Sequence, residues 1–467
     1  MAMQADIAAM RARRAVRREQ VRRRVVELIF LVYWLLIFEG ALRKWVFPQL
    51  ELVLFFVRVP VVLAIYALAL GHRLWPRPSP PLTVGYLFAA IALLWIPIQM
   101  MSVEYESLPI LLLAGYGWHN YFFYIPLAFL MAEQLRGDDL RRLVRQTFWI
   151  ALPTALLVVL QFYSPPSAIV NQGAALDEEY QFLSRTAALG YVRPSGFFTS
   201  SGGQVQFVTT LTAMLLANWT LPRGQRWVGQ QLLRVATAAA AVMIALSGSR
   251  GLFVFVGLLM LTAVAAGFVT GRRRVVARTV FWPAALIVAF VVVWPLAFPT
   301  SFEVFMTRWE GAQIGESQRF TYGFFGRALY DLYEFTDYLS EVPLTGYLLG
   351  MGGNAATRLA WLPDAAIGIE SGLGRHIIEL GPVLGVAFII FRVWIAGWLG
   401  TRVLRATHRS GDPLPLLLFG YVGISMLTAQ ITGAGVLQGY AWLFFGFCLA
   451  ATRLGTGLGS RMLKKNR

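Results

Sequence analysis

Long apolar runs, separated by short polar segments, repeat along most of this chain. Many of them hold about 20 residues, the length that an α-helix needs to cross a hydrocarbon core of about 30 Å. The pattern predicts an all-α polytopic membrane protein with about 12 transmembrane helices. The expected spans are residues 26–40, 50–71, 81–101, 108–131, 146–163, 204–221, 229–247, 252–270, 279–298, 376–398, 413–431 and 436–452.

The polar segments between these runs alternate between strongly and weakly basic. Cytoplasmic loops of membrane proteins collect arginine and lysine, so the alternation predicts that both termini are cytoplasmic. Residues 1–25 and 453–467 are then basic cytoplasmic tails, and 26–298 and 376–452 hold the helices. The expected periplasmic segments are a loop at 164–203 and a long, partly helical loop at 299–375.

Composition narrows the class further. The chain is 57% hydrophobic and only 14% charged, whereas a soluble protein is about 25% charged. Its net charge of +17 follows from the basic loops, so no nucleic-acid partner is expected. Cys448 is the single cysteine, and the four histidines are scattered, so neither a disulfide nor a metal site is expected.

Some arginines lie on the predicted outer side, where topology gives no reason for them. Arg250 follows a Ser-Gly-Ser turn between two spans, with Gly248 and Gly251 on either side. The glycines permit a sharp turn and a serine can cap the helix that follows. The N-terminus of that helix, together with the guanidinium group, would favour binding of a phosphate. The alternative is a lone arginine that extends to the membrane interface.

Two further outer segments carry candidate ligands. Arg185 and Arg193 lie in the loop before residue 204, where Pro194 and Gly196 indicate a turn. Residues 317–340 predict one amphipathic helix with Arg319 and Arg327 on neighbouring turns. Pairing of Arg327 with Asp331 is the structural alternative.

Charged residues near and within the spans are additional candidates. Arg58 lies inside an apolar run and is expected to face the bundle interior, after Arg43 and Lys44. Pairing with Glu39 would make this group structural.

A last cluster lies at the entry to the expected span 376–398. Glu370, Arg375, His376 and Glu379 occur together there, and Glu370 or His376 could deprotonate a hydroxyl group. Pairing of Glu379 with Arg375 is the alternative for those two residues.

Four segments in this order resemble the O-antigen ligase and polysaccharide polymerase superfamily of bacterial inner membranes. They are RPSGFF, SGSRG, PLTGYLLGMGG and ESGLGRHIIELGPVLG, and the resemblance covers roughly residues 110–450. The segment FEGALRKWVFP is similar to an exopolysaccharide-associated subgroup.

The resemblance implies a C-type glycosyltransferase (GT-C-like) fold and a reaction without metal or other cofactor at the periplasmic face. A glycan linked to undecaprenyl diphosphate would be transferred to an acceptor, and outer arginines would bind the diphosphate. Carried onto this chain, these are Arg193 and Arg250, together with one or more of Arg185, Arg319 and Arg327; the cluster around Glu370 adds Arg375 as a further candidate. Ligases of the superfamily have a His-Asn pair where this chain has Glu370-Ser371, which makes Glu370 the candidate base.

The expected function is polymerisation of lipid-linked repeat units into exopolysaccharide or O-antigen, with Glu370, Arg250 and His376 as catalytic candidates. A chain-length regulator and a flippase are the expected partners besides the lipid bilayer. One alternative is a ligase that transfers the glycan to lipid A core or protein. Another is a transporter or flippase of an anionic lipid-linked substrate, although no inverted repeat is evident.

Overall fold

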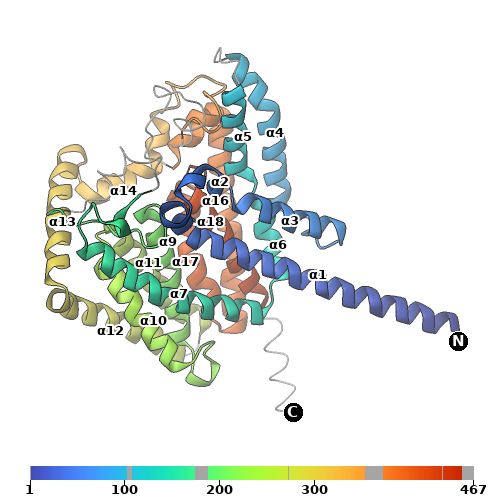
Figure 1. Cartoon of the computed structure of the whole chain (residues 1–467), viewed down its shortest axis with the longest axis horizontal. Coiled ribbons are helices and arrows are strands. Elements are labelled where there is room, and N and C mark those ends of the chain that lie inside the picture. Colours follow the sequence, from blue (N-terminus) through green and yellow to red (C-terminus); the bar gives the residue numbers. More distant parts are fainter. Residues whose placement is uncertain are drawn as a thin grey trace.

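The computed structural model of the chain describes residues 2–102, 108–173, 188–271, 273–352, 372–433 and 435–454. These residues form an all-α multi-pass architecture, and Figure 1 shows how the helices pack together. The helices are α1 Ala2–Ala41, α2 Glu51–Phe55, α3 Arg58–Gly71, α4 Pro80–Ser102, α5 Leu108–Phe122, α6 Ile125–Gln134, α7 Gly137–Tyr163, α9 Ser201–Thr220, α10 Gln230–Ala245, α11 Arg250–Thr270, α12 Arg273–Ala297, α13 Pro299–Arg319, α14 Gly323–Tyr333, α16 Gly374–Ser410, α17 Leu414–Thr428 and α18 Gly435–Leu454.

Eight stretches of the described chain are long and apolar enough to cross a membrane. They are Ala15–Val46, Pro48–Gly71, Pro80–Ser102, Gly137–Tyr163, Arg250–Thr270, Val276–Ala297, Gly374–Ser410 and Gly435–Arg453. Two shorter apolar helices, α10 and α17, coincide with further expected spans. The expected span 108–131 is instead divided into α5 and α6, because the helix is interrupted between them.

The centre of the bundle is α9, in which nearly every side chain is buried. It packs against α10, α11, α12 and α17, while α18 packs against α6 and α17. The basic start of the chain continues α1 as one helix, and its N-terminal part projects away from the other helices (Figure 1). The tail expected at 1–25 is therefore helical from residue 2 onward.

Helix α1 also defines the two ends of the bundle. Arg22 hydrogen-bonds to Gln134, and Lys44, in the π-helical turn Leu42–Val46 that follows α1, contacts the 195–198 turn. About 22 residues of helix separate the two, which is roughly 33 Å at 1.5 Å per residue and close to a bilayer core. We call these ends the Arg22 end and the Lys44 end.

Helix α16 is broken near its start. Gly381 has a φ of +81°, which an ordinary helix does not allow, and Pro382 follows it. A Cβ atom on Gly381 would lie 2.2 Å from the backbone oxygen of Leu344, so only glycine fits against the 344–352 segment. Two of the four family-like segments therefore pack together at this kink: PLTGYLLGMGG as far as Gly352, and ESGLGRHIIELGPVLG from Gly372 onward.

Candidate functional site

Three arginines from distant parts of the chain meet at the Lys44 end. Arg193 comes from the loop before α9, Arg250 begins α11, and Arg308 lies in α13. Each lies close enough to the others for electrostatic repulsion: Arg193 with both partners, and Arg308 with Arg250. We call these three residues the arginine cluster.

The turn before α11 positions Arg250. Gly248 has a φ of +55°, and the Ser249 hydroxyl caps the helix by accepting from the Leu252 N–H at 3.4 Å. The glycine geometry and the cap expected from the sequence are both present at these two residues. Arg308 reinforces the turn, because its Nη1 donates to the Gly248 carbonyl at 2.9 Å.

Arg250 is charge-compensated in this structure. Its two terminal nitrogens donate to the Glu316 carboxylate of α13 at 2.8 and 2.7 Å. The guanidinium also lies over the rings of Trp309 and Phe324, at 5.9 and 5.6 Å from their centres. Arg250 and the nearby Arg327 hold the pKa of Glu316 below its ordinary value, although burial opposes this shift.

Arg193 lacks such compensation. It forms no hydrogen bond or ion pair with the described residues, and its Nε is buried without a partner. Burial, followed by repulsion from Arg308 and Arg250, lowers the pKa of Arg193 to about 10. Burial and Arg250 also lower the pKa of Arg308. The arginine cluster therefore carries more positive charge than its neighbours among the described residues neutralise.

Lys44 holds the turn that carries Arg193. Its Nζ donates to the Ser195 hydroxyl at 3.1 Å and to the carbonyls of Gly196 and Phe198 at 3.1 and 2.6 Å. Gly196 has a φ of +58°, so the glycine of RPSG is needed for the turn. Lys44 is thus a positioning residue, and the FEGALRKWVFP segment supports the RPSGFF segment.

Arg43 and Arg58 belong to a separate buried ion network. Arg43 pairs with Glu51 at 2.7 Å and Glu39 at 3.5 Å, and Arg58 pairs with Glu39 at 2.8 Å. Arg58 faces the bundle interior as expected, and also donates to the Gly435 carbonyl at 3.1 Å. The pairing with Glu39 that the sequence offered as an alternative is present, so both arginines are structural here.

The predictions for the long outer loop need correction. Residues 317–340 do not form one helix: α13 ends at Arg319, and a second helix, α14, begins at Gly323, which has a φ of +52°. Arg319 is exposed and has no hydrogen bond or ion pair with the described residues. Arg327 contacts Glu316 at 3.3 Å and so reaches the arginine cluster indirectly.

His376 and Arg375 lie in the buried start of α16 and form no hydrogen bond with the three arginines of the cluster. The His376 Nε2 contacts Arg392 at 2.7 Å and its Nδ1 contacts the Tyr121 hydroxyl at 2.8 Å. Because arginine only donates, Nε2 accepts and the ring proton lies on Nδ1. Both ring nitrogens are therefore occupied, which does not support the catalytic role predicted for His376.

Arg375 and Glu379 are both buried but do not form the ion pair that was the structural alternative for them. Glu379 accepts from the Gly352 N–H at 2.9 Å, while two nitrogens of Arg375 have no partner in the described chain. A Cβ on Gly433 would lie 1.2 Å from Arg375 Nη1, so Arg375 fills the space that this glycine leaves. Glu370 and Arg185 lie outside the described residues, and their predicted roles stay predictions.

No protein-family model matches the chain, and no curated protein matches it. The charge, burial and contacts of the arginine cluster are therefore the basis for inferring what it binds. Arg193 and Arg250 were predicted as ligands from the sequence, whereas Arg308, which lies far along the chain, was not. Its only signal was an arginine beside Trp309 in a predicted outer loop.

Proposed function

We propose that the protein is a glycosyltransferase of the bacterial inner membrane that polymerises glycan repeat units carried on a lipid diphosphate. The Lys44 end, with the arginine cluster, faces the periplasm in this proposal. The supporting observation is the uncompensated charge of Arg193 beside Arg250 and Arg308. Such a group of partly buried guanidiniums suits a diphosphate, which can accept several charge-assisted hydrogen bonds.

The proposed reaction is a displacement at the anomeric carbon of the donor sugar. A hydroxyl oxygen of the acceptor forms the new bond to this carbon, while the bond from the carbon to the diphosphate oxygen breaks. The diphosphate leaves with the bonding electron pair, and the hydroxyl proton passes to a base, for which Glu370 is the candidate. Fixed guanidiniums stabilise the charge that develops on the leaving group, and one such donor contributes about 3 kcal/mol.

In this proposal, Glu316 and the ligand compete for Arg250. Its carboxylate occupies the hydrogen-bonding face of Arg250, where a phosphate group would otherwise be accommodated. Arg193 and Arg308 then bind the diphosphate first, and Arg250 joins them if Glu316 yields to the ligand. Arg327 is placed to retain Glu316 after such an exchange, since it already contacts the same oxygen.

The test is an assay with purified protein in lipid nanodiscs and a synthetic undecaprenyl-diphosphate-linked repeat unit. We expect longer lipid-linked glycans and free undecaprenyl diphosphate from the donor alone. R193Q and R308Q are expected to lower the rate by about a hundredfold, as loss of one fixed donor does. R319Q is the matched control, because Arg319 is exposed and unpaired among the described residues.

Three results would overturn the proposal. Equal rates for R193Q and R319Q would remove the arginine cluster from the reaction. Transfer only when lipid A core is added would replace polymerisation by ligation, and movement of the donor between leaflets without a new glycosidic bond would indicate transport.

A further inference from the structure

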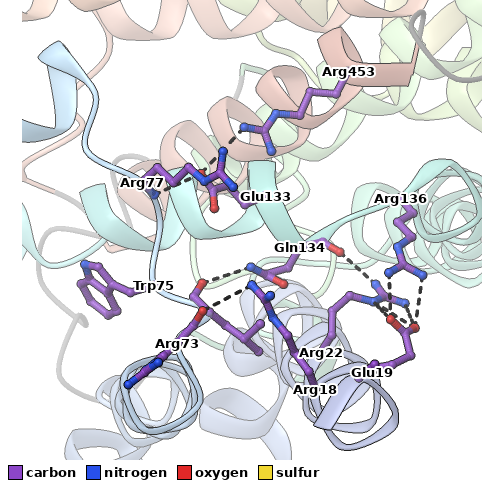
Figure 2. Close-up of a pocket in the computed structure, with 12 residues that line it drawn as sticks. Arg18, Glu19, Arg22, Arg73, Trp75, Arg77, Glu133, Gln134, Arg136 and Arg453 are labelled. Carbon is purple, nitrogen blue, oxygen red and sulfur yellow. Dashed lines mark hydrogen bonds and ion pairs between the residues drawn. The ribbon is translucent and has the colours of Figure 1, made fainter. Parts of the chain in front are cut away.

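A second group of arginines lines a cavity at the opposite, Arg22 end of the bundle. The cavity has a volume of about 710 Å³ and is formed by four chain segments that are distant in sequence. Figure 2 shows the side chains around it. The lining residues with charge are Arg18, Glu19, Arg22, Arg73, Arg77, Glu133, Arg136 and Arg453.

Hydrogen bonds across the cavity fix its walls. Arg22 donates to the Gln134 carbonyl at 2.9 Å, and the Gln134 side chain donates to the Leu74 carbonyl at 3.0 Å. The Arg77 backbone N–H donates to Glu133 at 3.0 Å. Three segments, α1, the 72–79 connection and α6, are thereby joined, so the cavity does not depend on one mobile loop.

The charges in this cavity do not balance. Six arginines share it with two carboxylates. Glu19 is occupied by Arg22 at 3.0 Å and Arg136 at 2.8 Å, and Glu133 lies 3.8 Å from Arg453. Asp139, which does not line the cavity, also pairs with Arg22 at 3.2 Å. The cavity therefore keeps an excess of positive charge after its own ion pairs are formed.

Arg73 and Arg77 contribute to this excess. Their guanidinium groups form no ion pair or hydrogen bond within the described chain. Arg73 also has a φ of +55°, a left-handed conformation that is uncommon for a residue with a side chain. The Arg73 carbonyl accepts from Arg18 at 3.5 Å, which helps to hold this backbone (Figure 2).

We infer that this cavity is a binding site for a phosphate-bearing anion, separate from the arginine cluster at the Lys44 end. Phosphate groups match the fork of guanidinium donors and would neutralise the excess charge. Two sources share this chemistry: the headgroup of an anionic phospholipid in the adjacent leaflet, and a soluble phosphate compound. The inference does not depend on the proposed glycosyl transfer.

Two measurements on the purified full chain test the site. The first is native mass spectrometry with phosphatidylglycerol or phosphatidylcholine added to the detergent micelle. The second is the shift in Tm caused by inorganic phosphate. The test variant is R73Q/R77Q, and R405Q/R409Q is the matched control, because both of these α16 arginines are exposed and unpaired among the described residues.

We expect R73Q/R77Q to weaken binding of one probe by roughly tenfold or more, while R405Q/R409Q retains most of it and R73K/R77K, which keeps the charge but loses the guanidinium fork, falls between them. Loss confined to phosphatidylglycerol identifies the lipid source, and loss confined to inorganic phosphate identifies the soluble source. Equal binding by R73Q/R77Q and R405Q/R409Q overturns the inference, as does equal binding of phosphatidylglycerol and phosphatidylcholine together with no response to phosphate. A failed glycosyltransferase assay would leave these results unchanged.

Discussion

At the scale of single residues, an arginine is a candidate ligand or a structural group according to whether a carboxylate neutralises its charge. Arg43 and Arg58 have carboxylate partners in the bundle interior, whereas Arg193 has none in the described chain. A buried cation without a partner opposes folding, so its retention is explained if an anionic ligand supplies the missing charge. Nothing in the local sequence distinguishes these arginines, because their partners come from other elements.

The Arg193 interpretation predicts a specific response to anions. Inorganic diphosphate is expected to raise the Tm of the unmodified protein, since it would relieve repulsion within the arginine cluster. This stabilisation is expected to shrink by at least half in R193Q and to persist in R319Q, as measured by thermal unfolding at several concentrations. Without ligand, R193Q is expected to be as stable as the unmodified protein or more stable. A large loss of stability in ligand-free R193Q would show that Arg193 is structural.

The ion pair of Arg250 and Glu316 predicts a dependence on pH. The pKa of Glu316 is lowered in the folded protein, so the pair contributes stability above the ordinary value of 4.5. This contribution is lost as the pH falls below 4.5 through the lowered pKa. E316Q is expected to be less stable than the unmodified protein by about 2 kcal/mol at pH 7, with the difference narrowing as the pH falls below 4.5.

The control for this prediction is E310Q. Glu310 is exposed on the same helix and has no hydrogen bond or ion pair among the described residues. Thermal unfolding from pH 7 to pH 3 measures all three proteins. A gap between E316Q and the unmodified protein that is independent of pH would contradict the assignment to the carboxylate charge.

At the scale of elements, apolar runs predicted where helices occur better than where they break. The described helices are interrupted after Phe122, after Arg319 and at Gly381, and the last two breaks have different causes. The break at Gly381 is required by tertiary packing, since the 344–352 segment approaches its Cα closely. The break after Arg319 coincides with the left-handed Gly323, a local signal that a purely amphipathic interpretation of 317–340 overlooked.

Packing between elements also explains why part of the candidate site was predictable. Arg193 and Arg250 each lie in a short turn with a positive-φ glycine, and turns of this kind leave a local sequence pattern. Arg308 lies within a regular helix, where the only relevant information is its contact with Gly248. That contact arises from folding of the whole chain, so sequence periodicity could not reveal it.

The close contact between α1 and the loop that carries Arg193 can be tested by substitution. A Cβ on Gly40 would lie 2.4 Å from the Phe197 carbonyl oxygen and 2.6 Å from the Thr199 nitrogen. G40A must therefore displace the loop that carries Arg193. We expect at least a tenfold loss of transfer activity, because a small displacement of a binding group lowers the rate of reaction strongly. G71A is the matched control, because nothing lies within 4 Å of the Cβ it would add. Equal activity of G40A and G71A would show that the loop is not held by α1.

At the scale of the whole molecule, the structure brings together the segments that the charge pattern assigned to one side. Three arginines from the strongly basic segments line the cavity at the Arg22 end: Arg22, Arg136 and Arg453. Lys44, Arg193 and Arg308, from the segments expected on the other side, meet at the Lys44 end. The alternation of basic and less basic loops is a property of the sequence, whereas these two groups of residues come together only in the folded protein. Both observations divide the chain between the same two ends.

The absolute orientation follows as a prediction that labelling can test. Cys448 is buried, so C448A supplies a background for single cysteines at exposed sites. R319C is expected to react with a membrane-impermeant maleimide in intact spheroplasts, because α13 belongs to the predicted outer loop. R409C, near the end of α16, is expected to react only after the membrane is permeabilised. Reaction of R409C in intact spheroplasts, with R319C protected, would reverse the orientation and place the arginine cluster in the cytoplasm, where a donor presented at the periplasmic face could not reach it.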